Sequence, residues 1–237
     1  MKTRMTNNPA RALTLIEVLV VLSVLVIAAG LLLPRLAGNT RSRRIQCVNN
    51  LKQVGMAYHL WGNDHDNKFP MQVSVTDGGT MELVPSGLVF PHYLVMSNEL
   101  STPKLLICPE DQDRTAAWTF STNVNDSRRN YYDRIGRGQE WQPMDDNHVS
   151  YFVGVDADPV RPGMLLAGDR NLTVDGIPLQ HGLASLATRS LVGWSKTMHK
   201  NCGNVVFADG SVWQFSAAKL REALAKTGVA TNRLAIP

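Results

Sequence analysis

An uninterrupted apolar segment runs from Leu13 to Leu33 and constrains this chain more than any other feature. It holds 21 residues and a single charged side chain, Glu17. A helix of about 20 apolar residues is long enough to span the roughly 30 Å hydrocarbon core of a bilayer. Three interpretations compete: a cleaved secretory signal peptide, a signal anchor that stays in the membrane, and a segment that is cleaved in front of its apolar run.

The signal-peptide interpretation fits poorly, because its apolar region should hold roughly 7–15 residues and end at small residues. Here Leu31–Leu33 continue the run beyond Ala28-Ala29-Gly30. Glu17 helps to decide between the other two interpretations, a permanent signal anchor and a segment cleaved in front of its apolar run. A carboxylate at the centre of a membrane helix costs roughly 2.5–3.5 kcal/mol on insertion scales and usually has a partner. Cleavage after Ala12 would create an α-amine on Leu13 that can meet Glu17 of a neighbouring chain. The alternative is that Glu17 snorkels to the headgroups.

The stretch Ala12-Leu13-Thr14-Leu15-Ile16-Glu17 follows a short basic leader and resembles the processing motif of type IV prepilins and type II secretion pseudopilins. The resemblance implies cleavage between Ala12 and Leu13 and an assembly role for Glu17. Pro34 falls where the family commonly has a proline. The sequence departs from the family at Ala12, where nearly all members have Gly, and at Leu13, where most have Phe. Because the prepilin peptidase prefers glycine, Ala12 decides whether this chain is cleaved.

Basic side chains flank the apolar run on both sides, so the positive-inside rule leaves its orientation open. The resemblance implies a single-pass protein of the inner (cytoplasmic) membrane with a cytoplasmic N-terminus. Its globular domain would be periplasmic or extracytoplasmic, and processing would allow it to enter a filament. The implied partners are prepilin peptidase, other pilin or pseudopilin subunits, the membrane and the inner-membrane assembly platform.

The net charge of +4 arises near the N-terminus. Seven of the 24 Lys and Arg residues precede Ile45, against one of the 20 Asp and Glu residues, which leaves a formal charge of −2 for the rest. This balance argues against a general nucleic-acid surface, and we expect no nucleic-acid partner. Arg41, Arg43 and Arg44 either bind anionic headgroups or form a solvated helix face.

After Pro34 the pattern becomes amphipathic, with apolar side chains every three to four residues. The positions expected on the buried stripe are Ile45, Val48, Leu51, Val54 or Gly55, Tyr58 and Trp61. We predict one long helix from about Leu13 to Trp61, kinked at Pro34. The expected organisation is a leader (1–12), a transmembrane and assembly helix (13–34), its amphipathic continuation (35–62) and an exported globular domain (63–237).

The globular part is expected to be rich in β-structure. Strands are predicted at Leu105–Pro109, Ser150–Val155 and Met164–Asp169, and a short helix at Ala217–Lys226. These elements give an α+β fold of the pilin-like kind, in which the long N-terminal helix packs on a small antiparallel β-sheet.

Asp209-Gly210, between two β-rich runs, predicts a hairpin with a two-residue type I′ turn. In that register Phe207 lies opposite Val212 and Val206 lies opposite Trp213. Both faces of the hairpin would be largely apolar, so we expect it to lie inside a sheet that is covered on both sides.

Two further signatures support a resemblance to one branch of prepilin-like proteins. Residues 47–55 match a Cys-x-Asn-Asn-Leu-Lys-Gln-hydrophobic-Gly pattern, and His199 precedes Asp209-Gly210 by ten positions. The second resembles the prepilin-processing-associated C-terminal domain of Planctomycetes, Verrucomicrobia and Lentisphaerae. His199 and Asp209 either share a metal or a catalytic role, or Asp209 shapes the turn while His199 bonds nearby loop backbone.

The three cysteines form no CxxC pair, which removes support for a zinc ribbon or a thioredoxin-like site. An exported domain allows a disulfide, for which Cys108 and Cys202 are the candidates, with Cys47 left unpaired. Asp64 and Asp66 are weak candidates for calcium in an order that does not fit an EF-hand. A solvated loop is the alternative for them, and we expect no cofactor.

The preferred function is therefore a structural subunit of a type IV pilus or a type II secretion pseudopilus, and not an enzyme. The alternative is a permanently anchored, exported binding domain that does not polymerise. An anchored enzyme that uses His199 and nearby acids is the third hypothesis.

Overall fold

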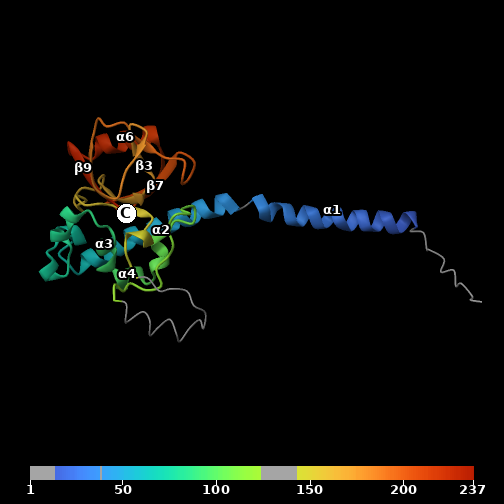
Figure 1. Ribbon diagram of the computed structural model, residues 1–237, viewed down its shortest axis with the longest axis horizontal. Coiled ribbons are helices and arrows are strands. Elements are labelled where there is room, and N and C mark those ends of the chain that lie inside the picture. The colour runs from blue at the N-terminus through green and yellow to red at the C-terminus, as the bar shows by residue number, and fades with distance from the viewer. Residues whose placement is uncertain (1–13, 38, 124–142) are drawn as a thin grey trace, which may run out of the picture. The chain divides into compact units, whose positions relative to one another are not determined.

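The computed structural model describes residues 14–37, 39–123 and 143–237 (Figure 1). The chain divides into two compact units, Met1–Ser42 and Arg43–Pro237, and each is described by itself. The predicted leader, residues 1–12, lies outside the described residues.

Two helices occupy the region in which one long helix was expected. Helix α1 spans Leu15–Ala37 and includes Pro34, and helix α2 spans Asn39–Asn63. Residue 38, between them, lies outside the described residues. Among the residues that the structure describes, no helix combines the length and the apolar character needed to cross a membrane. The transmembrane segment predicted at 13–34 begins outside them.

One face of α2 is buried in the globular unit. The buried side chains recur at helical spacing and are Cys47, Asn50, Leu51, Val54, Ala57, Tyr58 and Trp61. Ile45, expected on this stripe, is 54 % exposed, because the buried face passes through Cys47 instead. The helix ends at Asn63, two residues beyond the predicted end at about Trp61.

Six strands form one antiparallel sheet in the order β5-β9-β1-β2-β7-β8, and three short strands form a second sheet in the order β4-β3-β6. The strands are β1 (Tyr151–Gly154), β2 (Leu165–Asp169), β3 (Leu172–Val174), β4 (Ile177–Pro178), β5 (Gly182–Ala187), β6 (Val192–Trp194), β7 (Cys202–Phe207), β8 (Val212–Ser216) and β9 (Thr231–Ile236). The strands predicted at 150–155 and 164–169 are thus present as β1 and β2.

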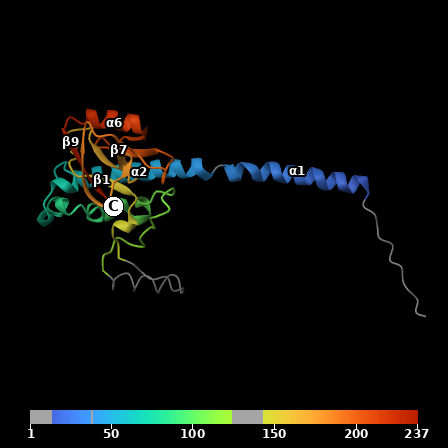
Figure 2. The same cartoon turned by 45° about the horizontal axis from the view of Figure 1, so that its top comes forward.

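The two faces of the large sheet bury different cores, as side-chain alternation along a strand requires. On β7, Val206 joins the core that contains the buried face of α2. Its neighbours Val205 and Phe207 join the core beneath α6 (Ala217–Lys226), the short helix predicted at these residues. Figures 1 and 2 show α2 and α6 on opposite sides of this sheet. The predicted α+β class, with helix packed on a small antiparallel sheet, is confirmed and is consistent with a pilin-like fold.

Short helical turns recur in the described residues between α2 and β1. They are η1 (Pro70–Gln72), η2 (Val75–Asp77), η3 (Met81–Ser86), α3 (Phe90–Leu94), α4 (Ser97–Leu100), η4 (Pro103–Leu106) and η5 (Asp146–His148). The strand predicted at Leu105–Pro109 is wrong, because η4 occupies part of it. Thr102 caps that turn by accepting from the N–H of Lys104, and Pro103 follows at its first position, where proline is favoured.

The hairpin between β7 and β8 differs from its prediction by one residue in register. Val206 lies opposite Val212 and Val205 lies opposite Trp213. The loop has three residues: Gly210 N–H donates to Phe207 O at 2.9 Å, and only Gly210 has a positive φ, 79°. This is a type I turn closed by a glycine bulge, not a type I′ turn. The predicted position inside the sheet is also wrong for β8, which is an edge strand with Trp213 59 % exposed.

Candidate functional site

Thr14 and Glu17 close the N-terminus of α1. The backbone N–H and the hydroxyl of Thr14 each donate to Glu17 Oε2 at 2.8 Å, and the Glu17 N–H donates to Thr14 Oγ1 at 3.4 Å. This reciprocal pattern is a capping box, which satisfies donors that a helix start leaves unpaired. The Thr-x-x-Glu spacing is the sequence signal of this box, and it gives Glu17 a second role beside the predicted assembly role. Glu17 therefore has a role within one chain.

The apolar side chains along the first half of α1 are uncovered in the single chain. Their exposed fractions run from 44 % to 83 %. They are Leu15, Ile16, Val18, Leu19, Val20, Val21, Leu22, Val24, Leu25, Val26 and Ile27. They occupy nearly every position from 15 to 27, interrupted only at Glu17 and Ser23, and so cover every face of the helix. A surface of this kind marks an interaction with lipid or with other protein.

The remaining N-terminal site residues are placed only in part. Ala12 and Leu13, the predicted processing site, lie outside the described residues. Pro34 lies within α1, three residues before its end at Ala37. Glu17 is the one residue of the predicted assembly site whose side-chain contacts the structure describes.

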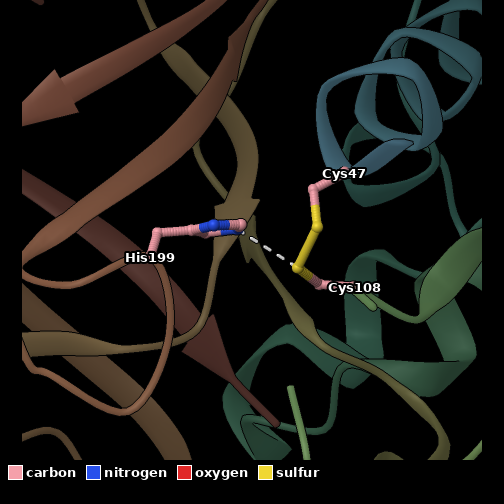
Figure 3. A group of neighbouring side chains, drawn as sticks. All are labelled: Cys47, Cys108 and His199. Atoms are coloured by element: carbon pink, nitrogen blue, oxygen red, sulfur yellow. Dashed lines mark hydrogen bonds between the residues drawn. A yellow bond between two sulfur atoms is a disulfide. The ribbon is translucent and has the colours of Figure 1, made fainter. Parts of the chain in front are cut away.

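Cys47 on α2 and Cys108, just after η4, form a disulfide with Cα atoms 5.1 Å apart (Figure 3). The predicted Cys108–Cys202 disulfide is therefore wrong. Cys202 begins β7, lies opposite Ser216 of β8, and is a free, half-buried thiol. The buried face of α2 brings Cys47 to Cys108 across 61 positions of sequence, a proximity that cysteine spacing alone does not reveal.

His199 points at this disulfide from the loop before β7 (Figure 3). Its Nε2 lies 3.2 Å from Cys108 Sγ and 3.4 Å from Asp169 Oδ2. Burial lowers the pKa of His199, which favours a neutral imidazole. His199, Lys200 and Asn201 all have positive φ, between 47° and 65°, and consecutive non-glycine residues in that region are energetically costly. This strained backbone conformation directs the His199 side chain into the interior of the globular unit.

Asp169, at the end of β2, is the carboxylate that meets His199. It is fully buried, and its Oδ2 accepts from the backbone N–H and the side-chain amide of Asn204 at 2.6 and 2.9 Å. Burial raises the pKa of Asp169 to about 7, partly opposed by the hydrogen bonds from Asn204. The sequence predicted the strand but not this role of Asp169, because an Asp at the end of a strand is usually expected to be exposed to solvent.

Asp209 and Gly210 form the hairpin turn. Asp209 Oδ1 accepts from the Ser211 N–H at 2.8 Å, the arrangement by which Asp stabilises turns. Gly210 supplies the left-handed residue of the loop. Within the described part of the chain, the carboxylate in contact with His199 is that of Asp169, at 3.4 Å, and not that of Asp209. The paired His199–Asp209 site that the ten-position spacing suggested is not formed.

Among the described residues, the one group of three or more clustered potential metal ligands is Cys47, Cys108 and His199. Asp64 and Asp66, the weak calcium candidates, are exposed in the turn after α2 and belong to no such group. Sequence reasoning did not bring the three residues of this group together, because each lies on a different segment.

The family model of the prokaryotic N-terminal methylation motif matches residues 7–33. The matched region contains the Thr14–Glu17 capping box and most of α1. The motif implies processing by prepilin peptidase and an exported, membrane-associated, prepilin-like protein. No curated protein and no solved structure matches the chain.

Proposed function

We propose that this protein is a structural subunit of a type IV pilus or of a type II secretion pseudopilus, and that it has no enzymatic activity. Prepilin peptidase cleaves it between Ala12 and Leu13, and it assembles through its N-terminal helix. The observation that carries the proposal is the uncovered apolar surface of α1 within the matched motif. That surface suits the membrane before assembly and the core of a helical filament after it.

Glu17 contributes to assembly through its charge. In the single chain its carboxylate already accepts two hydrogen bonds from Thr14. After cleavage, the α-amine of Leu13 on a neighbouring subunit supplies a positive charge to the same carboxylate. A buried charge left alone costs far more than a paired one, so the pairing favours the axial register of adjacent helices in which the two groups meet.

The protein is inserted as a single-pass protein of the inner membrane with its N-terminus in the cytoplasm and its globular domain on the far side. The disulfide between Cys47 and Cys108 supports this orientation, because disulfides persist in oxidising extracytoplasmic compartments. Other pilin or pseudopilin subunits and the inner-membrane assembly platform are its partners. No nucleic acid takes part.

A second candidate is a permanently anchored, exported binding domain that does not polymerise. The specific observation in its favour is Ala12, which replaces the glycine that the peptidase prefers.

The mass of the N-terminal peptide of the protein taken from membranes tests cleavage. A chain that begins at Leu13, N-methylated or not, is the expected result, and Ala12→Gly should increase the cleaved fraction while Ala12→Leu abolishes it. An N-terminus intact at Met1 in both the wild-type protein and the Ala12→Gly variant overturns the subunit proposal.

Glu17→Gln and Glu17→Ala separate assembly from capping. Glutamine retains the capping box but not the charge, since either Glu or Gln serves at that position. If Glu17 pairs with a neighbouring amine, both variants insert in the membrane and both fail to enter filaments. Normal incorporation of the Glu17→Gln protein, with loss only in Glu17→Ala, shows that capping is its whole role.

A further inference from the structure

We propose that the reduced form of this chain binds one Zn²⁺ ion through Cys47, Cys108 and His199, with Asp169 as the fourth ligand. The disulfide and the metal are then alternative occupants of the same buried centre. The proposal is independent of filament assembly, because every ligand lies in the globular unit that begins at Arg43.

The ligand atoms of the two cysteines and His199 are already close to the spacing that zinc needs, and Asp169 lies within reach of His199 but outside this group of three. A tetrahedral site with Zn–S about 2.3 Å and Zn–N or Zn–O about 2.0–2.1 Å places sulfur and nitrogen ligands about 3.5 Å apart, and nitrogen and oxygen ligands about 3.4 Å apart. The distance from His199 Nε2 to Cys108 Sγ is 3.2 Å and to Asp169 Oδ2 is 3.4 Å. The sulfur of Cys47 completes a group whose atoms lie within 4.8 Å of one another.

The centre is fully buried. Cys47, Cys108 and Asp169 have no exposed surface, and His199 is 2 % exposed. Within the described part of the chain, Asp169 Oδ1 has no hydrogen-bond partner. A buried carboxylate without a full set of partners is costly, and a bound cation removes that cost. Asn204, which donates twice to Oδ2, fixes the orientation of Asp169 as outer partners of metal ligands do.

Exchange between the two states is a balanced redox step. A dithiol or a phosphine delivers two electrons to the disulfide, and the two sulfurs take up two protons while the reductant is oxidised. Zn²⁺ then binds as both thiols release their protons, since the thiolate is the metal ligand. The sulfurs must separate to about 3.8 Å for tetrahedral zinc, so the disulfide excludes the metal.

Equilibrium dialysis of the detergent-purified full chain against Zn²⁺, with metal quantified by mass spectrometry, tests the site. We expect about one equivalent of zinc in the chain reduced anaerobically with a phosphine, as a single mononuclear site requires, and almost none in the oxidised chain. Co²⁺ in place of Zn²⁺ should give a thiolate-to-cobalt charge-transfer band in the reduced chain alone. Equal metal uptake by the reduced and oxidised chains overturns the proposal.

Variants identify the ligands. Cys47→Ser, Cys108→Ser and His199→Gln should each abolish stoichiometric binding. Asp169→Asn, which removes a direct ligand, should weaken binding by at least about 10-fold, the smallest loss seen when outer partners of metal ligands are removed. Cys202→Ser is the matched control, because this free thiol lies outside the group and its loss should leave binding unchanged. Retention of full affinity in the Cys47→Ser and Cys108→Ser chains contradicts the assignment.

Thermal unfolding distinguishes a folded site from a metal bound by unfolded cysteines. Because a ligand that binds only the native state stabilises it, Zn²⁺ should raise the unfolding midpoint of the reduced chain. An unchanged or lowered midpoint shows that zinc binds the unfolded chain and overturns the site. This measurement uses only the wild-type protein, so it does not depend on whether each variant folds.

Discussion

His92, in α3, is a histidine that the fold buries completely. Its Nδ1 lies 2.7 Å from Thr80 Oγ1, and its Nε2 has no hydrogen-bond partner in the described part of the chain. A protonated ring would carry an uncompensated charge there. Burial accordingly lowers the pKa of His92 to about 4, from 6.5. The residues next to His92 in the sequence did not predict its burial. That burial, which keeps the ring neutral, comes from the packing of segments that are distant in the sequence.

The pKa of His92 predicts a loss of stability in acid. As the pH falls from 6.5 to about 4, His92 becomes protonated in the unfolded chain but stays neutral in the native chain. The free energy of unfolding therefore falls. At 1.36 kcal/mol per pH unit the contribution is about 3 kcal/mol. His92→Gln should remove this part of the acid sensitivity, measured by urea unfolding at pH 7 and pH 4. Parallel pH profiles for the two proteins would contradict this assignment.

At the scale of elements, α2 shows what each part of its nine-residue signature does. Cys47 forms the disulfide, the Asn50 side-chain amide donates to Ile107 O at 2.9 Å, and Leu51 is fully buried. Gly55 lies where the helix crosses β7. A Cβ at this position would lie 2.8 Å from Val206 Cγ2 and 3.6 Å from the Gly210 Cα. The signature is therefore a set of packing contacts between one helix and the segments it covers.

Gly55→Ala tests the close approach of α2 to the sheet. Alanine gains up to about 1 kcal/mol of helix propensity over glycine. Overpacking a full core typically costs about 1–3 kcal/mol, and the branched, fully buried Val206 leaves little freedom to relax. With the full propensity gain, we expect a net loss of up to about 2 kcal/mol in urea unfolding. Met56→Ala, at a side chain 58 % exposed on the same helix, is the control and should change stability little. A stabilised Gly55→Ala protein would show that helix propensity outweighs the contact.

Periodicity and turn residues predicted the elements whose signals are local. The buried turns of α2, strands β1 and β2, and helix α6 (Ala217–Lys226) follow from them. The register of the β7–β8 hairpin did not, because Asp-Gly is compatible with both two- and three-residue loops. The choice depends on how Phe207 and Val206 divide between two cores, which only the assembled sheet determines.

At the scale of the whole molecule, the chain divides into two units, Met1–Ser42 and Arg43–Pro237, and the four segments expected from the sequence stay a prediction. The N-terminal motif was readable because its information is contained in consecutive residues. The sequence did not predict the buried centre, because its members come from four segments spread over more than a hundred positions. They are Cys47, Cys108, Asp169 and His199. Their convergence depends on sheet order and on the burial of α2, neither of which a linear pattern specifies.

The Cys47–Cys108 disulfide joins α2 to the chain that follows η4, and its loss should affect the whole globular unit. A cross-link spanning 61 positions restricts the unfolded chain by about 4 kcal/mol in the chain-entropy model. Cys47→Ala/Cys108→Ala should therefore lower the free energy of unfolding by about that amount, whereas Cys202→Ala changes it little. Tryptophan fluorescence during urea unfolding is the appropriate measurement, because all five tryptophans follow Arg43 and report on this unit alone. Equal losses in the double variant and in Cys202→Ala would mean that the disulfide does not stabilise the fold.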